Sequence, residues 1–200
     1  MTTHKKLRKQ FEDVISVYKD IPLSDGDIMK IVNGQANVVT YPNIHKYKSI
    51  DELLAPHGAC CILYETHEHY GHWVCLTIRN EDLYGTGTIY PVLEYFDSYG
   101  EEIDYPLNVI PVDFAKNTHQ DKPYLSELML DDSCTYQLSY NEHQFQKFSP
   151  NVKDCGRWIA TRIILKDMPL DDFIKLFKGM YSDDIVTAIT CDPSQLQNSV

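Results

Sequence analysis

The chain has 200 residues, of which 43% are hydrophobic and 24% are charged, and its formal net charge is −11. This length and composition predict one soluble globular domain over residues 1–200, with a sizeable core. The acidic balance argues against a broad nucleic-acid footprint, which requires clustered Lys and Arg. No apolar run approaches the ~20 residues of a membrane span, so we expect no membrane partner.

The first quarter of the chain is predicted to be helical. Apolar residues recur at helical spacing over residues 5–18, which predicts a surface helix. Asp27 is the predicted cap of a short helix that runs through Ile31. Ser49 is the predicted cap of another helix over residues 50–54.

The centre of the chain is predicted to be β-structure. Residues 59–64 form a continuous apolar run, which is typical of a buried strand. Residues 72–79 alternate between two faces, and residues 88–96 form the next strand. Glycines in the intervening segment, residues 84–87, favour a turn, so these two strands are predicted to form an antiparallel hairpin.

Three elements are expected after this hairpin. Residues 113–120 are predicted to be a loop. Residues 123–130 are predicted to be a helix, because a proline suits its first turn. Residues 134–139 are predicted to be a further strand.

The C-terminal part is predicted to be helical. A helix begins at Cys155, and we expect its apolar stripe to pack into the core through Gly156, Ile159, Ala160, Ile163 and Ile164. Two shorter helices are expected to begin near Asp171 and Ser182. Residues 192–200 are predicted to be a flexible tail.

The segment from Lys153 to Trp158 carries the strongest functional indication in the chain. It places Cys155 at the beginning of a helix, with Asp154 as the predicted N-cap. A thiol there faces unpaired backbone N–H groups and the positive end of the helix dipole, which favour the thiolate. Because the thiolate is the reactive form, Cys155 is the predicted nucleophile of a cysteine hydrolase. The alternative is a small buried core residue.

Two residues upstream supply the partners that such a nucleophile needs. His72 is the predicted general base, and Asp97, at the end of the following strand, is predicted to orient its ring. If the hairpin is symmetric about the Tyr84–Gly85 bond, His72 and Asp97 lie directly opposite each other. Directly opposed side chains are within reach of an imidazole–carboxylate hydrogen bond.

A glutamine completes the set. Gln146 is the predicted oxyanion donor, beside the backbone N–H of Cys155, and Gln144 is its rival. The chain order is therefore His, Asp, Gln, Cys.

A zinc-stabilised binding module is the interpretation from a different class. Zinc-type ligands are dense in one segment, at His67, His69, His72 and Cys75. On a strand, His72 and Cys75 project from opposite faces, and the sequence has no Cys-x-x-Cys pair. We therefore expect no metal site and no other cofactor.

These motifs, in this order, resemble a known group of enzymes. They are Gly71-His72-Trp73-Val74, Phe96-Asp97-Ser98-Tyr99-Gly100 and Asp154-Cys155-Gly156, with a glutamine before the last. The combination resembles the adenovirus-protease and SUMO-protease group of cysteine peptidases. It most resembles the capsid-maturation proteases of virophages and Polinton-type elements, in which a Tyr-Asn stretch, here Tyr140-Asn141, also follows the Phe-Asp-Ser-Tyr strand.

The resemblance spans residues 20–170 and implies a fold and an activity. The fold is α+β, papain-like or adenain-like, with a central mixed sheet flanked by helices and the nucleophile at the beginning of a core helix. The activity is hydrolysis after small residues, such as Gly-Gly or Gly-X-Gly, in viral structural or capsid proteins during virion maturation. Trp73 matches the tryptophan that covers a narrow glycine tunnel in SUMO-type relatives, and Gly156 is placed with it as substrate-binding.

The resemblance also implies partners and a location. We expect a monomer, located in the host cytoplasm or viral factory and packaged in the virion. An isopeptidase acting on a host ubiquitin-like modifier and a non-catalytic interaction module remain alternatives. The adenovirus enzyme requires DNA and a disulfide-linked peptide for full activity. The acidic charge argues against strong DNA activation here, and the thiols considered for such a peptide are Cys60, Cys75 and Cys134.

Overall fold

The computed structural model describes residues 3–19, 21–68, 70–146, 153–179 and 182–191. Within these residues the centre is a five-stranded sheet in the order β1-β2-β3-β4-β5. The outer pairs of strands are parallel and the inner pairs are antiparallel. The strands are β1 (Asn37–Thr40), β2 (Ala59–His67), β3 (Tyr70–Glu81), β4 (Tyr90–Asp97) and β5 (Gln137–Tyr140).

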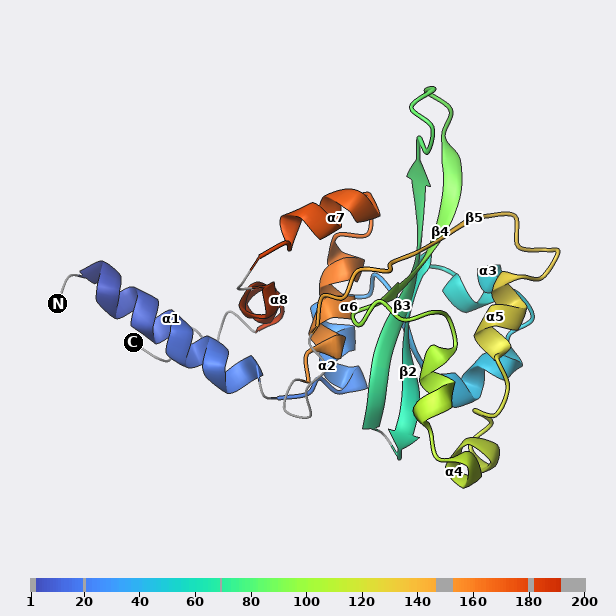
Figure 1. The fold of residues 1–200 in the computed structure, drawn as a ribbon, viewed down its shortest axis with the longest axis horizontal. Coiled ribbons are helices and arrows are strands. Elements are labelled where there is room, and N and C mark those ends of the chain that lie inside the picture. Colours follow the sequence, from blue (N-terminus) through green and yellow to red (C-terminus); the bar gives the residue numbers. More distant parts are fainter. Residues whose placement is uncertain (1–2, 20, 69, 147–152, 180–181, 192–200) are drawn as a thin grey trace.

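Helices cover both faces of this sheet (Figure 1). One face carries α2 (Asp25–Ile31), α6 (Cys155–Ile164), α7 (Leu170–Leu176) and α8 (Ser182–Thr190). The other carries α3 (Ile50–Leu54), α4 (Val112–Asn117), α5 (Tyr124–Met129) and the 3-10 helices η1 (Tyr41–Lys46) and η2 (Tyr105–Val109). A mixed sheet with helices on both faces, and Cys155 beginning a core helix, confirms the predicted α+β class.

Strand β3 separates two hydrophobic cores. Trp73 and Cys75 pack into the core beneath α6, whereas Val74 and Leu76 pack into the core beneath α3 and α5. The predicted alternation of this strand is therefore confirmed. Both faces are apolar because both are covered by helices, and burying each such side chain contributes about 1.5–3 kcal/mol.

The register of the β3–β4 hairpin differs from the predicted one by two residues. Asp97 pairs with Val74 rather than with His72. The turn is centred later because the Asp82 carboxylate accepts hydrogen bonds from two backbone N–H groups of the turn, at 3.0 and 2.7 Å. Since side chains repeat every two residues, this shift keeps His72 on the same face as Asp97 but diagonal to it.

The ends of two helices were predicted with different success. Ser49 caps α3, as predicted, by accepting a hydrogen bond from Glu52 N. The cap of α2 is Ser24 rather than Asp27, so that prediction was wrong. Asp27 instead closes a capping box, because its carboxylate accepts from Ser24 N.

Other predicted elements need smaller corrections. The loop expected over residues 113–120 is largely the helix α4, and the strand expected from residue 134 begins only at Gln137. Ile164 is 37% exposed, so it does not belong to the buried stripe of α6. The tail expected over 192–200 lies outside the described residues.

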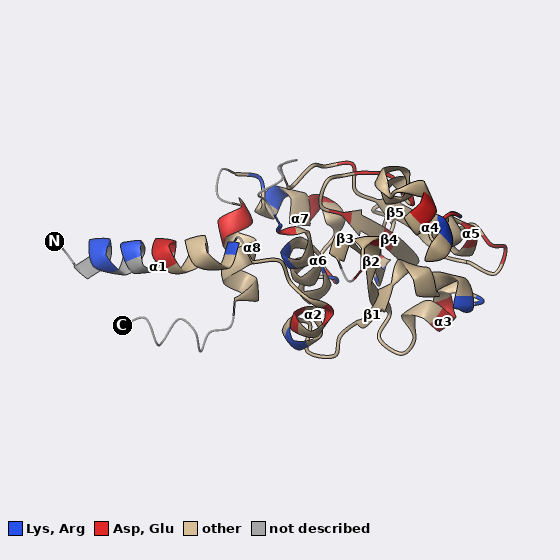
Figure 2. Cartoon of the chain, turned by 90° about the horizontal axis from the view of Figure 1, so that it is seen from below, with Lys and Arg blue, Asp and Glu red and all other residues tan. Residues whose placement is uncertain are grey.

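Helix α1 (Thr3–Lys19) extends away from the body of the molecule and contacts α8 (Figures 1 and 2). Lys19 Nζ lies 2.8 Å from Asp184 Oδ1 and fastens the base of α1 to α8. Among the described helices, none has both the length and the apolar character that crossing a membrane requires.

Candidate active site

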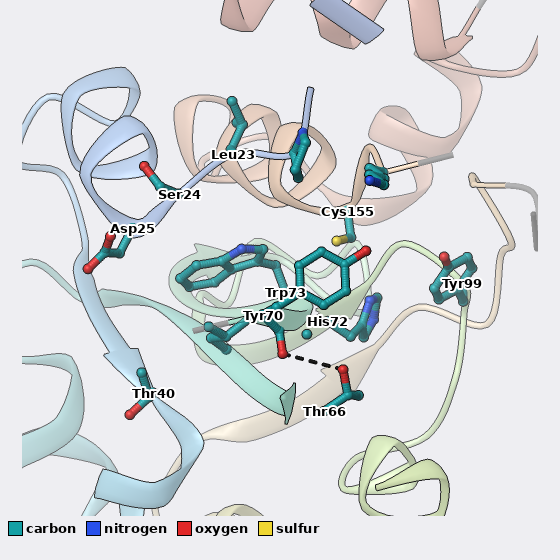
Figure 3. Close-up of a pocket in the computed structure, with 14 residues that line it drawn as sticks. Leu23, Ser24, Asp25, Thr40, Thr66, Tyr70, His72, Trp73, Tyr99 and Cys155 are labelled. Carbon is teal, nitrogen blue, oxygen red and sulfur yellow. Dashed lines mark hydrogen bonds between the residues drawn. The ribbon is translucent and has the colours of Figure 1, made fainter. Parts of the chain in front are cut away.

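Cys155 is the first residue of α6, the helix that lies against β3. Asp154 occupies the N-cap position of α6, as predicted, but its side chain makes no capping hydrogen bond. Its carboxylate lies 3.9 Å from Arg157 Nε. Residues 156–163 are all buried, whereas the Cys155 side chain is partly exposed and lines a surface pocket (Figure 3). The helix therefore buries two turns and presents its first side chain to the pocket.

A buried cluster of charges holds the other end of α6. Arg162 Nε donates to Glu94 Oε1 at 2.6 Å, and Arg79 contacts the same carboxylate. Arg162 also donates to the carbonyl groups of Leu165 and Met168, just beyond the helix. These contacts fix the C-terminal end of α6 against β4.

His72 reaches the thiol from β3. Its strand position shares a face with Val74 and Leu76, whereas α6 packs on the opposite face. The ring nevertheless contacts Cys155, because both residues lie at the ends of their elements. His72 Nε2 lies 2.9 Å from Asp97 Oδ1, which leaves Nδ1 as the nitrogen that can exchange a proton with the thiol.

Asp97 ends β4 and is fully buried. Its Oδ1 also accepts a hydrogen bond from Tyr99 N at 2.7 Å. The side chain of Asn141, the residue after β5, makes two hydrogen bonds to the backbone of Asp97. Asp97 N donates to Asn141 Oδ1 at 2.9 Å, and Asn141 Nδ2 donates to Asp97 O at 2.8 Å. The carboxylate that faces His72 is thus held through both its main chain and its side chain.

The electrostatics of the site favour a protonated His72. Burial lowers the pKa of the ring, but the Asp97 charge, the Asp97 hydrogen bond and the contact with Cys155 outweigh burial and raise the pKa to about 10. The imidazolium is therefore the stable form of His72 at neutral pH. A ring with so high a proton affinity takes the proton of the neighbouring thiol, and the resulting imidazolium stabilises the thiolate in an ion pair.

Gln146 is buried against the two residues that follow Asp97. Its Oε1 accepts from Ser98 Oγ at 2.9 Å, and its Nε2 donates to Tyr99 Oη at 3.2 Å. Gln144 is exposed and donates from Nε2 to the Gln146 carbonyl at 3.0 Å. The assignment of Gln146 as oxyanion donor stays a prediction, because residues 147–152, between it and Cys155, lie outside the described residues.

The pocket at Cys155 has a volume of about 360 Å³. Its wall includes Trp73, which is 5% exposed, and Leu23, which comes from the segment before α2 (Figure 3). Gly156 lies beneath both, since a Cβ there would meet Leu23 Cβ at 3.1 Å and Trp73 Cδ1 at 3.4 Å. Gly156 therefore allows the close packing of this wall and does not itself line the pocket.

Sequence reasoning missed several residues of this pocket. Leu23 reaches it from far upstream and had no local pattern to reveal it. Tyr99 lines the pocket and was noted only as one letter of the Phe-Asp-Ser-Tyr-Gly motif. Lys153 and Tyr70 also line it, with the Lys153 ammonium 6.0 Å from the centre of the Tyr70 ring.

The residues considered for zinc do not converge. His72 and Cys75 belong to opposite faces of β3, and Cys75 lies in the core beneath α6. In the part of the chain that the structure describes, no group of three or more His, Cys, Asp or Glu is placed to hold a metal ion. His69 lies outside that part. Of the thiols considered for a peptide partner, Cys60 and Cys75 are buried and Cys134 is partly exposed.

The chain matches no protein-family model. It is 37% identical over 182 residues to "Uncharacterized protein V9" of Sputnik virophage, a match that covers 88% of this chain and 98% of V9. The chain therefore belongs to the same protein family as V9.

Two solved structures are also similar. They are crystal structures of the ASFV pS273R protease, one with selenomethionine, each with a TM-score of 0.43 and with 14% or 13% sequence identity. The match covers 84% of this chain and 66% of the protease chain, so this chain spans just under two thirds of that protein's length.

Proposed function

We propose that the chain is a cysteine endopeptidase that cleaves after small residues. The observation that carries the proposal is that Cys155 from α6 and His72 from β3 line one pocket, while the buried Asp97 of β4 lies 2.9 Å from the His72 ring. A thiol, an imidazole and a carboxylate in series form the arrangement that activates cysteine for attack on an acyl carbon.

In the first half of the reaction, Cys155 Sγ attacks the scissile carbonyl carbon after His72 has taken the thiol proton. The tetrahedral intermediate collapses to a thioester as the C–N bond breaks, and His72 gives its proton to the leaving amine. In the second half, water attacks the thioester while His72 accepts its proton. The products are a free carboxylate and the restored thiol.

Two further residues assist these steps. Asp97 keeps the His72 ring in the required orientation and stabilises its positive charge. Gln146 Nε2 and the Cys155 backbone N–H donate to the oxyanion, where charge develops in the transition state.

The pocket supports the proposed specificity for small residues. Trp73 presents a flat aromatic side chain to it and is held in place by Leu23 and Gly156. A substrate strand that must lie flat beneath such a ring has little room for side chains next to the scissile bond. We therefore propose glycine-type cleavage sites.

The biological setting follows from the relative. Since V9 is a virophage protein, we propose that the substrates are viral structural or capsid proteins, cleaved during virion maturation. The enzyme would act as a monomer in the host cytoplasm or viral factory and be packaged in the virion. The acidic charge of −11 supports a protein substrate rather than strong binding to nucleic acid.

The test is cleavage of the cognate major capsid protein by the wild-type chain and by Cys155→Ala, measured by intact mass. We expect products that end in glycine with wild type alone. Identical intact substrate in both reactions would contradict the proposal. Labelling of the wild-type chain by an electrophile on a ubiquitin-like C-terminus, without capsid cleavage, would favour the isopeptidase alternative.

A further inference from the structure

Tyr99 contacts three residues of the candidate site, His72, Asp97 and Gln146. It lies in the turn after β4, two residues beyond Asp97, and its side chain lines the pocket with Cys155 and His72 (Figure 3). Its ring stacks on the His72 ring, with centroids 4.9 Å apart and planes at 26°. Its backbone N–H donates to Asp97 Oδ1 at 2.7 Å.

The hydroxyl of Tyr99 contacts the fourth member of the set. Gln146 Nε2 donates to Tyr99 Oη at 3.2 Å, while Ser98 Oγ donates to Gln146 Oε1 at 2.9 Å. The amide oxygen lies toward Ser98 and the amide nitrogen toward Tyr99. A hydroxyl at each end of the amide therefore holds the Gln146 side chain in place.

We propose that Tyr99 is a positioning residue that sets the plane of the His72 ring by stacking and holds the Gln146 amide in place by its hydroxyl. This inference rests on the proposed function, since it assigns the two contacts to separate parts of the same reaction. The ring acts on the base, and the hydroxyl acts on the oxyanion donor.

The stacking contact has an electrostatic consequence. The face of an aromatic ring attracts a cation, and the attraction grows as the pair loses water. Tyr99 therefore stabilises the charged form of His72, in addition to Asp97. The titratable or charged groups that face this ring or line the same pocket are Asp97 from β4, Cys155 from α6, Asp25 from α2, Tyr99, Tyr70 and Lys153.

The hydroxyl remains protonated while it does this. Burial raises the pKa of Tyr99, and the neighbouring charges of Cys155 and Asp97 raise it further. A neutral phenol can accept the Gln146 hydrogen bond without placing a negative charge beside the oxyanion.

Two substitutions separate the two contacts. Tyr99→Phe removes the hydroxyl and keeps the ring, whereas Tyr99→Leu removes both. Tyr136→Phe is the matched control, because it removes a phenol hydrogen bond to Asp51 outside the pocket. Circular dichroism of each variant establishes that it is folded.

Two rates are measured across pH for each variant. The first is cleavage of a glycine-containing peptide, as kcat and KM. The second is alkylation of Cys155 by iodoacetate, read by peptide mapping. This anionic reagent reacts rapidly only while the imidazolium beside the thiolate is charged, and its reaction requires no protease activity.

For Tyr99→Phe we expect kcat to fall about tenfold at unchanged KM, less than the full loss of an oxyanion donor, with the alkylation profile unchanged. For Tyr99→Leu we expect the alkaline limb of both profiles to move down by about one pH unit, as loss of a desolvated cation–π contact predicts. Tyr136→Phe should match wild type in both.

A kcat equal to wild type in Tyr99→Phe would overturn the role of the hydroxyl. An unmoved alkylation limb in folded Tyr99→Leu would overturn the role of the ring. If wild type cleaved no peptide but its alkylation limb still moved in Tyr99→Leu, the ring's role would stand and the proposed protease function would fail.

Discussion

Two carboxylates of β4, only three residues apart, hold positive side chains in opposite ways. Glu94 is fully buried and contacts two arginines, Arg79 and Arg162, which are themselves buried. Asp97 is also fully buried, but it faces a single histidine that is 15% exposed and opens onto the pocket. One Asp97 oxygen, Oδ2, has no hydrogen-bond partner among the described residues.

Under the proposed function, the difference separates a structural site from a reactive one. The two arginines hold Glu94 on both sides, and this cluster fixes α6. Histidine changes charge, so the Asp97 pair has two states, and its ring contacts the thiol that would use them. The same strand thus anchors α6 through Glu94 and, under the proposed function, activates the first residue of α6 through Asp97.

Asp97→Asn should show the largest effect, because it removes the negative charge that faces His72. The amide keeps the shape of the side chain but loses the charge that holds His72 protonated and oriented. We expect the cleavage rate to fall by about 10³- to 10⁴-fold, by analogy with the loss of a triad aspartate. Steady-state kinetics measure this, and thermal unfolding should show a folded protein. Full activity would mean that another group orients His72.

Glu94→Gln tests the structural role of the buried Glu94 cluster with Arg79 and Arg162. Removing one partner of a buried ion pair leaves the remaining charge uncompensated, which costs about 3–5 kcal/mol. We expect the unfolding free energy in urea to fall by that amount, while kcat per folded, titratable Cys155 stays unchanged. A stable variant with a reduced kcat would reverse the roles assigned to the two carboxylates.

Gln146→Ala tests whether Gln146 donates a hydrogen bond to the oxyanion. Loss of one preorganised donor lowers kcat by about 10²- to 10³-fold. Gln144→Ala is the matched control, because its amide is exposed and contacts only a backbone carbonyl among the described partners. Equal losses in both variants, or a loss only in Gln144→Ala, would remove Gln146 from the proposed mechanism.

The pH dependence should be the most gradual effect. Burial lowers the pKa of His72, but Asp97 and Cys155 together raise it from 6.5 to about 10, so the folded state holds this proton more tightly than the unfolded chain. The stability from this pair is therefore complete below about pH 6.5 and is lost as the pH rises towards 10. Urea unfolding at several pH values should show this decline in wild type and not in His72→Gln. Parallel declines would place the linkage elsewhere.

Much of this arrangement could be predicted from the sequence, because short-range rules govern it. The alternation of β3 and the helix that begins at Cys155 follow from local periodicity, and the start of α3 follows from the Ser49 cap. The face shared by His72 and Asp97 also follows from periodicity, which is why the candidate pair survived an error of two residues in the register.

What could not be predicted depends on side chains that meet only after folding. The Asp82 carboxylate moved the centre of the hairpin turn through hydrogen bonds to backbone N–H groups, which no spacing rule reveals. Leu23 reaches the pocket from a distant segment, and the contacts of Tyr99 require the final turn geometry. Residues 113–120 were wrongly predicted to be a loop, because the short helix α4 has no side-chain cap that marks its start.

The most direct test of the central claim is covalent capture of the nucleophile. A peptide that ends in Gly-Gly and carries a thiol-reactive electrophile at its C-terminus is incubated with wild type, Cys155→Ala and His72→Gln, and adducts are located by intact mass and peptide mapping. We expect one adduct on Cys155 in wild type, none in Cys155→Ala and a much slower reaction in His72→Gln. An adduct on the partly exposed Cys134 instead, or equal rates in wild type and His72→Gln, would contradict the proposed role of Cys155 and His72.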